Sequence, residues 1–513
     1  MKKNLLFIIF ASSFLLFYHL GETSLVNWDE AWLASVSQDI AIRGDWFGGQ
    51  WNGQTWFYEP PLVTWSLAVL YKIFGPSEFW LRSLNAIFGI LIIIVVYNLS
   101  ALITKSAKSA FISVIILLSN IEFLFRGRQI NVEIPVTFFL VFTIYAALKT
   151  LSSPQRKWWL ITGIFLGLAF LTKRASPILI FPALLPIILN KSLRGMYRPV
   201  RPVAISFLTV FFVVAVPWYL ISYLRWGNQF INEFFLGYTL GKIRSVNPGA
   251  GTDIWFYITA LRHAFKFWFP LIPFAIIWAT VKSFRDRKIA VLTIFIWTFL
   301  IFLTLAPIKS SWFLLPIHPA IAIIVGLLIR TIPIFWSSRQ NIAGAPEPCT
   351  DALRERPASN CVAVGGRREV SLVRGFFLPF FFIFSVSILN LYLYRRQAFP
   401  PDKWLPQKEL GLTVKNLTGP DDLVVTAEYE FPALRYYSER EVRTAARQPD
   451  YEGKYWWIWD NTDIATALRH GRDIITIHRP GAEWPIDVWG YRREKLTETN
   501  GRIISRLLLQ TPP

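Results

Sequence analysis

Runs of about 20 apolar residues, separated by short basic loops, limit what this chain can fold into. The first run, residues 5–20, follows Lys2 and Lys3, and comparable runs recur as far as residues 375–394. A helix of about 20 residues crosses the roughly 30 Å hydrocarbon core of a bilayer. We therefore predict an α-helical polytopic membrane protein with about 11 or more transmembrane helices.

Composition and charge support a membrane protein and argue against a nucleic-acid-binding protein. Of the 513 residues, 53% are hydrophobic and only 17% are charged, yet the formal net charge is +20. Much of the basic excess lies in short loops between apolar runs, which is the positive-inside signal of membrane topology rather than a nucleic-acid footprint. We expect a multi-pass protein of the inner (cytoplasmic) membrane, with its N-terminus in the cytoplasm and its C-terminus on the extracytoplasmic, periplasmic side. Nucleic acid is not expected as a partner.

The chain divides into a membrane domain, residues 1–394, and a soluble extracytoplasmic α/β domain, residues 395–513. In the second, strand-like segments at 423–426, 455–459 and 474–477 alternate with helical ones at 408–417 and 462–469. Residues 21–81 form a first extracytoplasmic loop with short juxtamembrane helices, one of them amphipathic at 65–74. Residues 335–374 form a flexible cytoplasmic loop, which contains both cysteines, Cys349 and Cys361; neither a disulfide framework nor a zinc spacing is indicated.

Charged residues at the ends of separate spans fall on one face in this topology. Asp29 and Glu30, between Trp28 and Trp32, emerge just beyond the first span, and acids and cations follow at the outer ends of later spans, namely Glu59, Arg126, Arg128, Glu133, Lys173, Arg174 and Lys309. Cations facing carboxylates suit the departure of a phosphate, because the cations neutralise it while a carboxylate takes a proton from the acceptor. The alternatives are structural: Asn27 or Asp29 capping a helix that begins near Ala31, and cations snorkelling to lipid head groups.

Several motifs resemble one family in order and spacing. They are residues 28–31 (WDEA), 43–46 (RGDW), 60–62 (PPL), 128–139 (RQINVEIPVTFF), 167–173 (GLAFLTK) and 309–319 (KSSWFLLPIHP). The ordered set, which covers roughly residues 28–328, resembles the GT-C glycosyltransferases, in the branch that contains bacterial aminoarabinose lipid A transferases and dolichyl-phosphate-mannose protein mannosyltransferases.

The resemblance implies transfer of a sugar, with inversion, from a polyprenyl-phosphate donor to a cell-envelope acceptor, which is a lipid A-type glycolipid, a glycan or a protein. Asp29 matches the catalytic carboxylate, with Glu30 beside it, and Glu133 matches a second acidic position. The donor phosphate is assigned to cations: Arg126, Arg128, Lys173, Arg174 and Lys309.

One departure from the family pattern concerns the residue before the double proline, where relatives commonly carry Lys or His and this chain has Glu59. Glu59 is a candidate metal ligand or substrate contact, and a divalent metal stays possible. Tyr58, Trp32 and His318 are further candidates for substrate or first-loop contacts.

The competing class is a membrane transporter or lipid flippase without transferase chemistry, because charged side chains in membranes also line transport paths. The sequence shows no inverted repeat, and its unusual charges gather at one face rather than near the midplane, which favours the enzyme.

Overall fold

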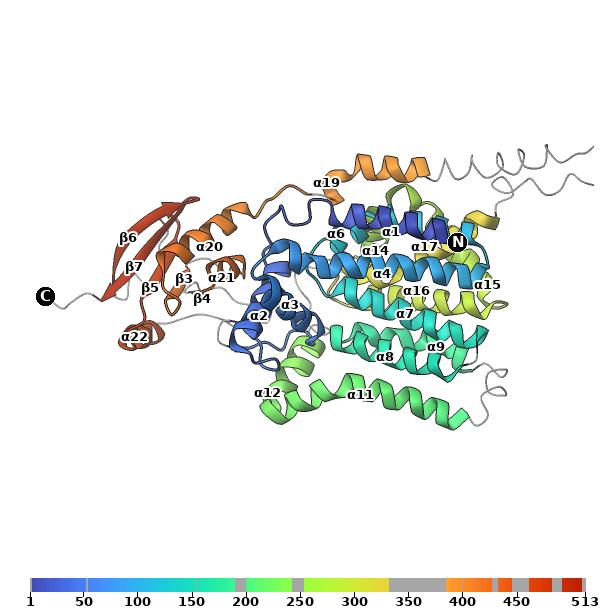
Figure 1. Cartoon of the computed structure of the whole chain (residues 1–513), viewed down its shortest axis with the longest axis horizontal. Helices are drawn as coiled ribbons and strands as arrows, with labels where there is room; N and C mark the ends of the chain where they lie inside the picture. Colours follow the sequence, from blue (N-terminus) through green and yellow to red (C-terminus); the bar gives the residue numbers. More distant parts are fainter. Residues whose placement is uncertain are drawn as a thin grey trace, which may run out of the picture.

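The structure is a computed structural model that describes residues 2–51, 54–153, 155–189, 200–241, 253–331, 384–398, 400–426, 432–444, 461–481 and 491–509. Side chains at 2–4, 29, 200–204, 238–241, 444, 461–462 and 509 lie outside that description. A bundle of helices occupies one end of the molecule and a small sheet the other, with α2, α3 and α12 between them (Figure 1).

The bundle contains helices that run side by side along the long axis of the molecule (Figure 1). In chain order the helical elements are α1 (Lys2–Phe17), α4 (Glu78–Thr104), α5 (Ala107–Leu118), α6 (Ile121–Gly127), α7 (Glu133–Ser152), α8 (Arg156–Thr172), η1 (Ser176–Ile180), α9 (Phe181–Ile188), α11 (Val200–Trp226), α12 (Asn228–Phe230), η2 (Ile231–Gly241), α14 (Phe256–Phe265), η3 (Lys266–Trp268), α15 (Leu271–Ser283), α16 (Arg287–Leu305), η4 (Ser311–Ile317), α17 (His318–Thr331) and α19 (Arg395–Ala398).

The described helices confirm the predicted fold class. Five are long and apolar enough to cross a membrane, and up to seven spans result if each of two bent helix pairs counts as one. Four shorter apolar helices accompany them, including Leu5–Phe17 and Ser176–Ile188. The total of about 11 spans stays a prediction. The cytoplasmic loop at 335–374 and the strand expected at 455–459 lie outside the described residues.

Two predicted straight spans are bent. The helix expected at 110–125 turns by 71° between α5 and α6. Asn120 causes the break, because its Oδ1 accepts a hydrogen bond from Phe123 N (2.8 Å) and so caps a new helix. The span expected at 266–281 begins earlier, with α14, and turns by 102° before α15. Pro270, the residue before α15, has no backbone N–H to continue a helical ladder through this bend.

The predicted first loop, residues 21–81, holds two short helices and a two-stranded antiparallel sheet. These are α2 (Asp29–Arg43), α3 (Leu62–Phe74), β1 (Gln50–Trp51) and β2 (Gln54–Thr55). The predicted amphipathic segment at 65–74 lies within α3. Helix α2 begins at Asp29, two residues earlier than expected, and Trp28 before it has a φ of 71°, in the sparsely populated left-handed region.

The C-terminal part is a five-stranded mixed sheet with helices α20 (Leu405–Leu417), α21 (Pro432–Ser438) and α22 (Asn461–Arg469). The strands are β3 (Leu423–Thr426), β4 (Glu441–Thr444), β5 (Ile474–His478), β6 (Tyr491–Thr499) and β7 (Arg502–Leu509), in the order β4-β3-β5-β7-β6. Strand β3 is parallel to both β4 and β5, whereas β6 and β7 form an antiparallel hairpin. This confirms the predicted α/β character, with strands at 423–426 and 474–477.

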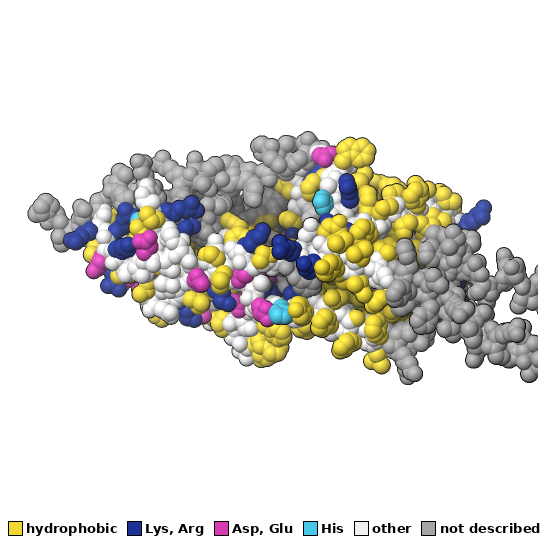
Figure 2. Space-filling view, turned by 90° about the horizontal axis from the view of Figure 1, so that it is seen from above, with side chains coloured by type: hydrophobic (Ala, Val, Ile, Leu, Met, Phe, Trp, Pro, Cys, Tyr) yellow, Lys and Arg dark blue, Asp and Glu magenta, His cyan; other side chains and the backbone are white. Residues whose placement is uncertain are grey.

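The surface changes character along the long axis. Hydrophobic side chains cover the helical end in the face shown in Figure 2, whereas Lys, Arg, Asp and Glu gather toward the sheet. Large hydrophobic residues such as Phe284 (87% exposed) and Leu305 (79%) stand on the outside of the bundle. Such residues are expected where lipid, not water, surrounds the protein.

Candidate active site

Three acid-cation pairs are present, and two of them join segments that are distant in the sequence. The Nζ of Lys173, directly after α8, donates to Glu133 Oε1 at the start of α7 (2.7 Å). Arg174 Nε lies 3.8 Å from Oε2 of Glu59, in the loop before α3. The third pair lies within α6, where Arg126 Nε is 3.1 Å from Glu122 Oε1. The structure thus places these cations beside acids, while their location at the outer face stays a prediction.

An aromatic ring covers the cation of each pair. Trp312, in η4, lies 4.3 Å from the guanidinium of Arg126, and the next residue, Phe313, lies 5.0 Å from the Lys173 ammonium. Tyr58 lies 4.9 Å from the guanidinium of Arg174. Each pair thus combines an acid on one side with a π-face on another, and such faces attract cations.

The three pairs form one electrostatic neighbourhood. The charges of both Lys173 and Arg126 reach Glu133. Tyr58 lies in the field of Arg174, Glu59, Lys173 and Glu133, while burial raises the pKa of Tyr58 to about 12, so that its phenol stays protonated at neutral pH. The Oε2 atom of Glu59 is buried and accepts no hydrogen bond from the described part of the chain. Its carboxylate can therefore still accept from a ligand. We name Glu59, Glu122, Arg126, Glu133, Lys173 and Arg174 the charged cluster.

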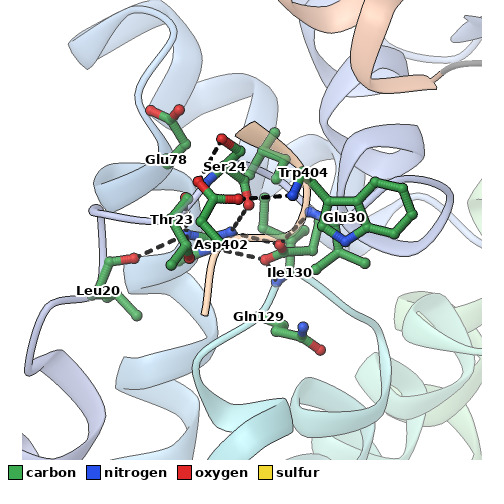
Figure 3. A network of polar contacts seen from close by, with 12 residues as sticks. Leu20, Thr23, Ser24, Glu30, Glu78, Gln129, Ile130, Asp402 and Trp404 are labelled. Carbon is green, nitrogen blue, oxygen red and sulfur yellow. Dashed lines mark hydrogen bonds and ion pairs between the residues drawn. The ribbon is translucent and has the colours of Figure 1, made fainter. Parts of the chain in front are cut away.

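Glu30 belongs to a different, fully satisfied network. Arg82, on α4, donates to both of its carboxylate oxygens, from Nε (2.8 Å) and Nη2 (2.7 Å). The backbone N–H groups of Val26 and Ile130 donate to the same two oxygens (2.8 Å each). Figure 3 shows this network around Glu30 and Ile130. Because Glu30 is 0% exposed and accepts four hydrogen bonds, its geometry favours a positioning role over the catalytic one expected from the sequence.

Arg128 and Lys309 both donate hydrogen bonds to backbone carbonyls at helix ends. Arg128 Nη1 donates to the carbonyl oxygens of Leu15 (3.1 Å) and Leu16 (3.3 Å), in the last turn of α1. Lys309 Nζ donates to Thr304 O (2.7 Å) and to Ala306 O (3.0 Å), where α16 ends. Cations at the carboxyl ends of helices satisfy orphan carbonyls and the helix dipole. These contacts favour a capping role for two of the five cations that the sequence assigned to phosphate.

The remaining candidates divide between the cluster and the bundle. Trp32, on α2, packs on Tyr58 with 4.7 Å between ring centroids, so both lie beside the charged cluster. His318, at the start of α17, is buried and packs against Phe265 at 5.1 Å; its described contacts include no residue of the first outer loop. Asp29 is the first residue of α2, and its side chain lies outside the described residues. The side chain of Asn27 does not cap α2; its Oδ1 accepts a hydrogen bond from Ala433 N instead (3.2 Å).

A metal at Glu59 finds little support. The described residues contain no group of three or more His, Cys, Asp or Glu side chains that could hold a metal ion. Glu59 instead faces the guanidinium of Arg174, a cation that competes with a metal for the same carboxylate.

Sequence reasoning missed four residues that the structure places in these networks. Glu122 belongs to the charged cluster, Trp312 and Phe313 cover two of its cations, and Arg82 holds Glu30. A signal was present for Arg82, since an arginine inside an otherwise apolar span requires a partner. No comparable signal marks Trp312 or Phe313 in a chain with 23 Trp and 43 Phe.

Comparison with known proteins agrees with this architecture. The profile of the dolichyl-phosphate-mannose-protein mannosyltransferase family matches residues 58–221. An uncharacterized protein of Aquifex aeolicus is 26% identical over 324 residues, 63% of each chain. An undecaprenyl phosphate-alpha-4-amino-4-deoxy-L-arabinose arabinosyl transferase of Serratia proteamaculans is 24% identical, over 62% of this chain and 58% of the relative. The matched regions therefore span about three fifths of these relatives.

Solved structures extend the similarity to the whole fold. ArnT from Cupriavidus metallidurans, crystallised with undecaprenyl phosphate, superposes with a TM-score of 0.71 at 16% identity, over 98% of this chain and 97% of that one. The archaeal oligosaccharyltransferase AglB from Archaeoglobus fulgidus gives a TM-score of 0.53 at 11% identity, over 93% of this chain and 69% of that one. The helical bundle, the loop that holds α2 and α3, and the small C-terminal sheet therefore have the fold of ArnT, and the matched sequences resemble those of GT-C membrane glycosyltransferases.

Proposed function

We propose that this protein transfers a sugar from a polyprenyl-phosphate-linked donor to a cell-envelope acceptor at the extracytoplasmic side of the membrane. The observation that carries the proposal is the charged cluster, in which Arg126 on α6 and the consecutive residues Lys173 and Arg174 after α8 lie next to acids and aromatic rings. A departing phosphate needs convergent positive charge in a site of low polarity. The family match and the similarity to ArnT support the same class of donor.

The cations have a defined task in this reaction. Lys173, Arg174 and Arg126 hold the phosphate that links the sugar to the lipid. In the structure their charges are balanced by Glu133, Glu59 and Glu122. The phosphate enters as an additional anion, and each cation shares its donors between the acid and the phosphate oxygens. As the bond from C1 to the phosphate oxygen breaks, the cations stabilise the negative charge that develops there.

Asp29 is the proposed general base. The acceptor hydroxyl oxygen attacks C1 of the sugar, its proton passes to the Asp29 carboxylate, and the electron pair of the broken C1–O bond leaves with polyprenyl phosphate. Attack opposite the leaving group inverts the anomeric carbon, and no covalent enzyme intermediate forms.

Two contacts support this placement of position 29. Trp32 follows Asp29 by three residues on α2, and positions three apart share a helix face. Trp32 touches Tyr58, which covers Arg174 of the charged cluster. In addition, Glu30 accepts from Ile130 N, in the turn that follows Arg126 (2.8 Å). The start of α2 is thus tied to two segments of the charged cluster.

The experiment is transfer from a radiolabelled undecaprenyl-phosphate sugar in membranes that contain the wild type, Asp29→Asn or Glu498→Gln. We expect transfer by the wild type and a loss of about 100-fold or more for Asp29→Asn, since general-base catalysis contributes about 10²–10⁴-fold. Glu498→Gln, at an exposed acid of β6, is expected to change transfer little. Movement of donor across the bilayer without transfer in the wild type would favour the transporter.

A further inference from the structure

Ser24 and Leu25, in the loop that leads into α2, are held by the C-terminal part of the chain. Asp402 Oδ2 accepts from both the backbone N and the Oγ of Ser24 (2.8 Å each), and Figure 3 shows this contact. The hydroxyl of Tyr437, on α21, accepts from Leu25 N (2.9 Å). Three donors of a loop in the first 30 residues therefore depend on acceptors about 380 to 410 positions later.

The opposite side of the same loop is held by the membrane part. Arg82 Nη1 donates to Thr23 O (2.7 Å) and Nη2 to Ser24 O (2.9 Å), besides the pair that Arg82 makes with Glu30. The loop is clamped between α4 and the C-terminal part. Trp28, between the clamped residues and Asp29, has a φ of 71°. A non-glycine residue rarely adopts such a conformation and keeps it only where its surroundings enforce it.

The packing of helix α21 against α2 and α4 can hold Trp28 in this conformation. Tyr436 and Tyr437 pack in one buried apolar cluster with residues of α2 and α4 and with Leu25. Arg435 is buried 3.6 Å from Asp39 Oδ1 of α2, with its guanidinium 5.2 Å from the ring of Trp51.

The hydroxyl of Tyr437 also reaches α4. It donates to Glu78 Oε1 (3.0 Å), the same oxygen that receives Lys408 Nζ of α20. One hydroxyl thus links the loop, α4 and the C-terminal helices.

We infer that the C-terminal part is a positioning element of the catalytic machinery, in which Asp402 and Tyr437 fix the backbone that carries the proposed base. This inference rests on the proposed function of Asp29. Neither residue touches the reacting atoms; both act through Ser24 and Leu25, which set where α2 begins. A C-terminal part that serves only to bind the acceptor has no need of these contacts.

The test uses the full-length protein with four variants, one of which, Asp402→Asn, is a conservative replacement. Tyr437→Phe removes one hydroxyl and keeps the packed ring, and Asp402→Ala removes the acceptor for Ser24. Lys495→Ala is the matched control, since Lys495 is on β6 of the same part and pairs only with Glu498 in a contact that is about half exposed. Steady-state transfer and amide hydrogen exchange at residues 24–30 are measured for each.

We expect kcat to fall by about 10- to 100-fold for Tyr437→Phe and Asp402→Ala, because small misplacements of a catalytic group have effects of this size. The KM values for donor and acceptor stay within about twofold, the amides of Ser24 and Leu25 exchange faster, and Asp402→Asn, which keeps an acceptor oxygen, recovers part of kcat. Lys495→Ala leaves all of these values unchanged.

Two results overturn the inference. One is a raised acceptor KM at unchanged kcat, which assigns the C-terminal part to acceptor binding. The other is unchanged exchange at Ser24 and Leu25 in both variants. Failure of the proposed function is recognised separately, because a wild type that shows no transfer rejects it whatever the exchange data show.

Discussion

The Nζ atom of Lys173 lies 2.7 Å from Oε1 of Glu133, and the ring of Phe313 covers the same ammonium at 5.0 Å. The three residues come from the end of α8, the start of α7 and η4. Their meeting point has the same composition as the sites around Arg126 and Arg174: one cation, one acid and one aromatic ring. Lys173 and Arg174 are consecutive in the chain, whereas Arg126 lies on α6. One anionic ligand shared by all three cations explains this repeated arrangement more simply than three independent stabilising contacts.

The buried pair of Glu30 and Arg82 predicts a large effect on stability. Glu30→Gln leaves Arg82 as a buried charge without its counter-ion, which costs about 3–5 kcal/mol. We expect a clearly lower unfolding temperature for purified Glu30→Gln in detergent. The control is Glu498→Gln, which removes an exposed acid paired with Lys495 and is expected to change the unfolding temperature little. Equal unfolding temperatures for the two variants would contradict the structural role of Glu30.

Tyr58 predicts a difference between loss of a hydroxyl and loss of a ring. Because burial raises the pKa of Tyr58 to about 12, its phenol is neutral at physiological pH and its described contact with Arg174 is through the ring. Tyr58→Phe should keep donor KM within about twofold. Tyr58→Leu removes a cation-π contact worth roughly 0.5–2 kcal/mol and should raise donor KM by about 2- to 30-fold. If Tyr58→Phe is as defective as Tyr58→Leu, the hydroxyl carries the function instead.

The ion pair of Asp45 and Arg225 predicts that its contribution to stability changes with pH only in acid. The Arg225 Nη1 and Nη2 atoms lie 2.7 and 2.5 Å from the two carboxylate oxygens of Asp45, and this hydrogen bonding lowers the pKa of Asp45 below its ordinary value of 3.8. A depressed pKa means that the pair contributes stability above pH 3.8 and loses it as the pH falls through the lower, folded-state pKa.

The measurement for this pair is the difference in unfolding temperature between the wild type and Asp45→Asn. The difference should be constant from pH 8 to pH 5 and vanish in stronger acid. It corresponds to at most about 1 kcal/mol, since the pair is partly exposed. A difference that already disappears near pH 6 would mean that the pKa of Asp45 is raised rather than lowered, and would contradict this prediction.

Hydrophobic run length predicted the architecture well, because a bilayer imposes a minimum length on each span. Periodicity failed where a polar residue or a proline interrupts an apolar run, at Asn120 and Pro270. The β6–β7 hairpin was missed although Asn500 and Gly501 are a strong turn signal; both have positive φ, 49° and 67°. Its first strand, with Arg492, Arg493 and Lys495, does not alternate between apolar and polar residues and so does not look like a strand.

The site was predicted in outline but not in its roles. The predicted topology placed the acids and cations on one face, but it did not say that Lys173 pairs with Glu133. It could not separate Arg174, which faces Glu59, from Lys309, which caps α16, because both are single cations at the outer end of a span. The difference depends on which carbonyl or carboxylate lies within reach after folding, and spacing in the sequence does not contain that information.

The most direct test of the account is the affinity for polyprenyl phosphate, the leaving group itself, measured by titration of purified variants in nanodiscs. Lys173→Gln and Arg174→Gln should each weaken binding by about 10-fold or more, since hydrogen bonds to charged groups contribute about 1.5–3 kcal/mol. Lys309→Gln, which removes a helix-capping cation, should weaken the binding of polyprenyl phosphate by less than about twofold. For the uncharged polyprenol, each of the three variants should change the affinity by less than about twofold. Binding that depends on Lys309 and is indifferent to Lys173 and Arg174 would contradict the assignment of the charged cluster to the donor phosphate.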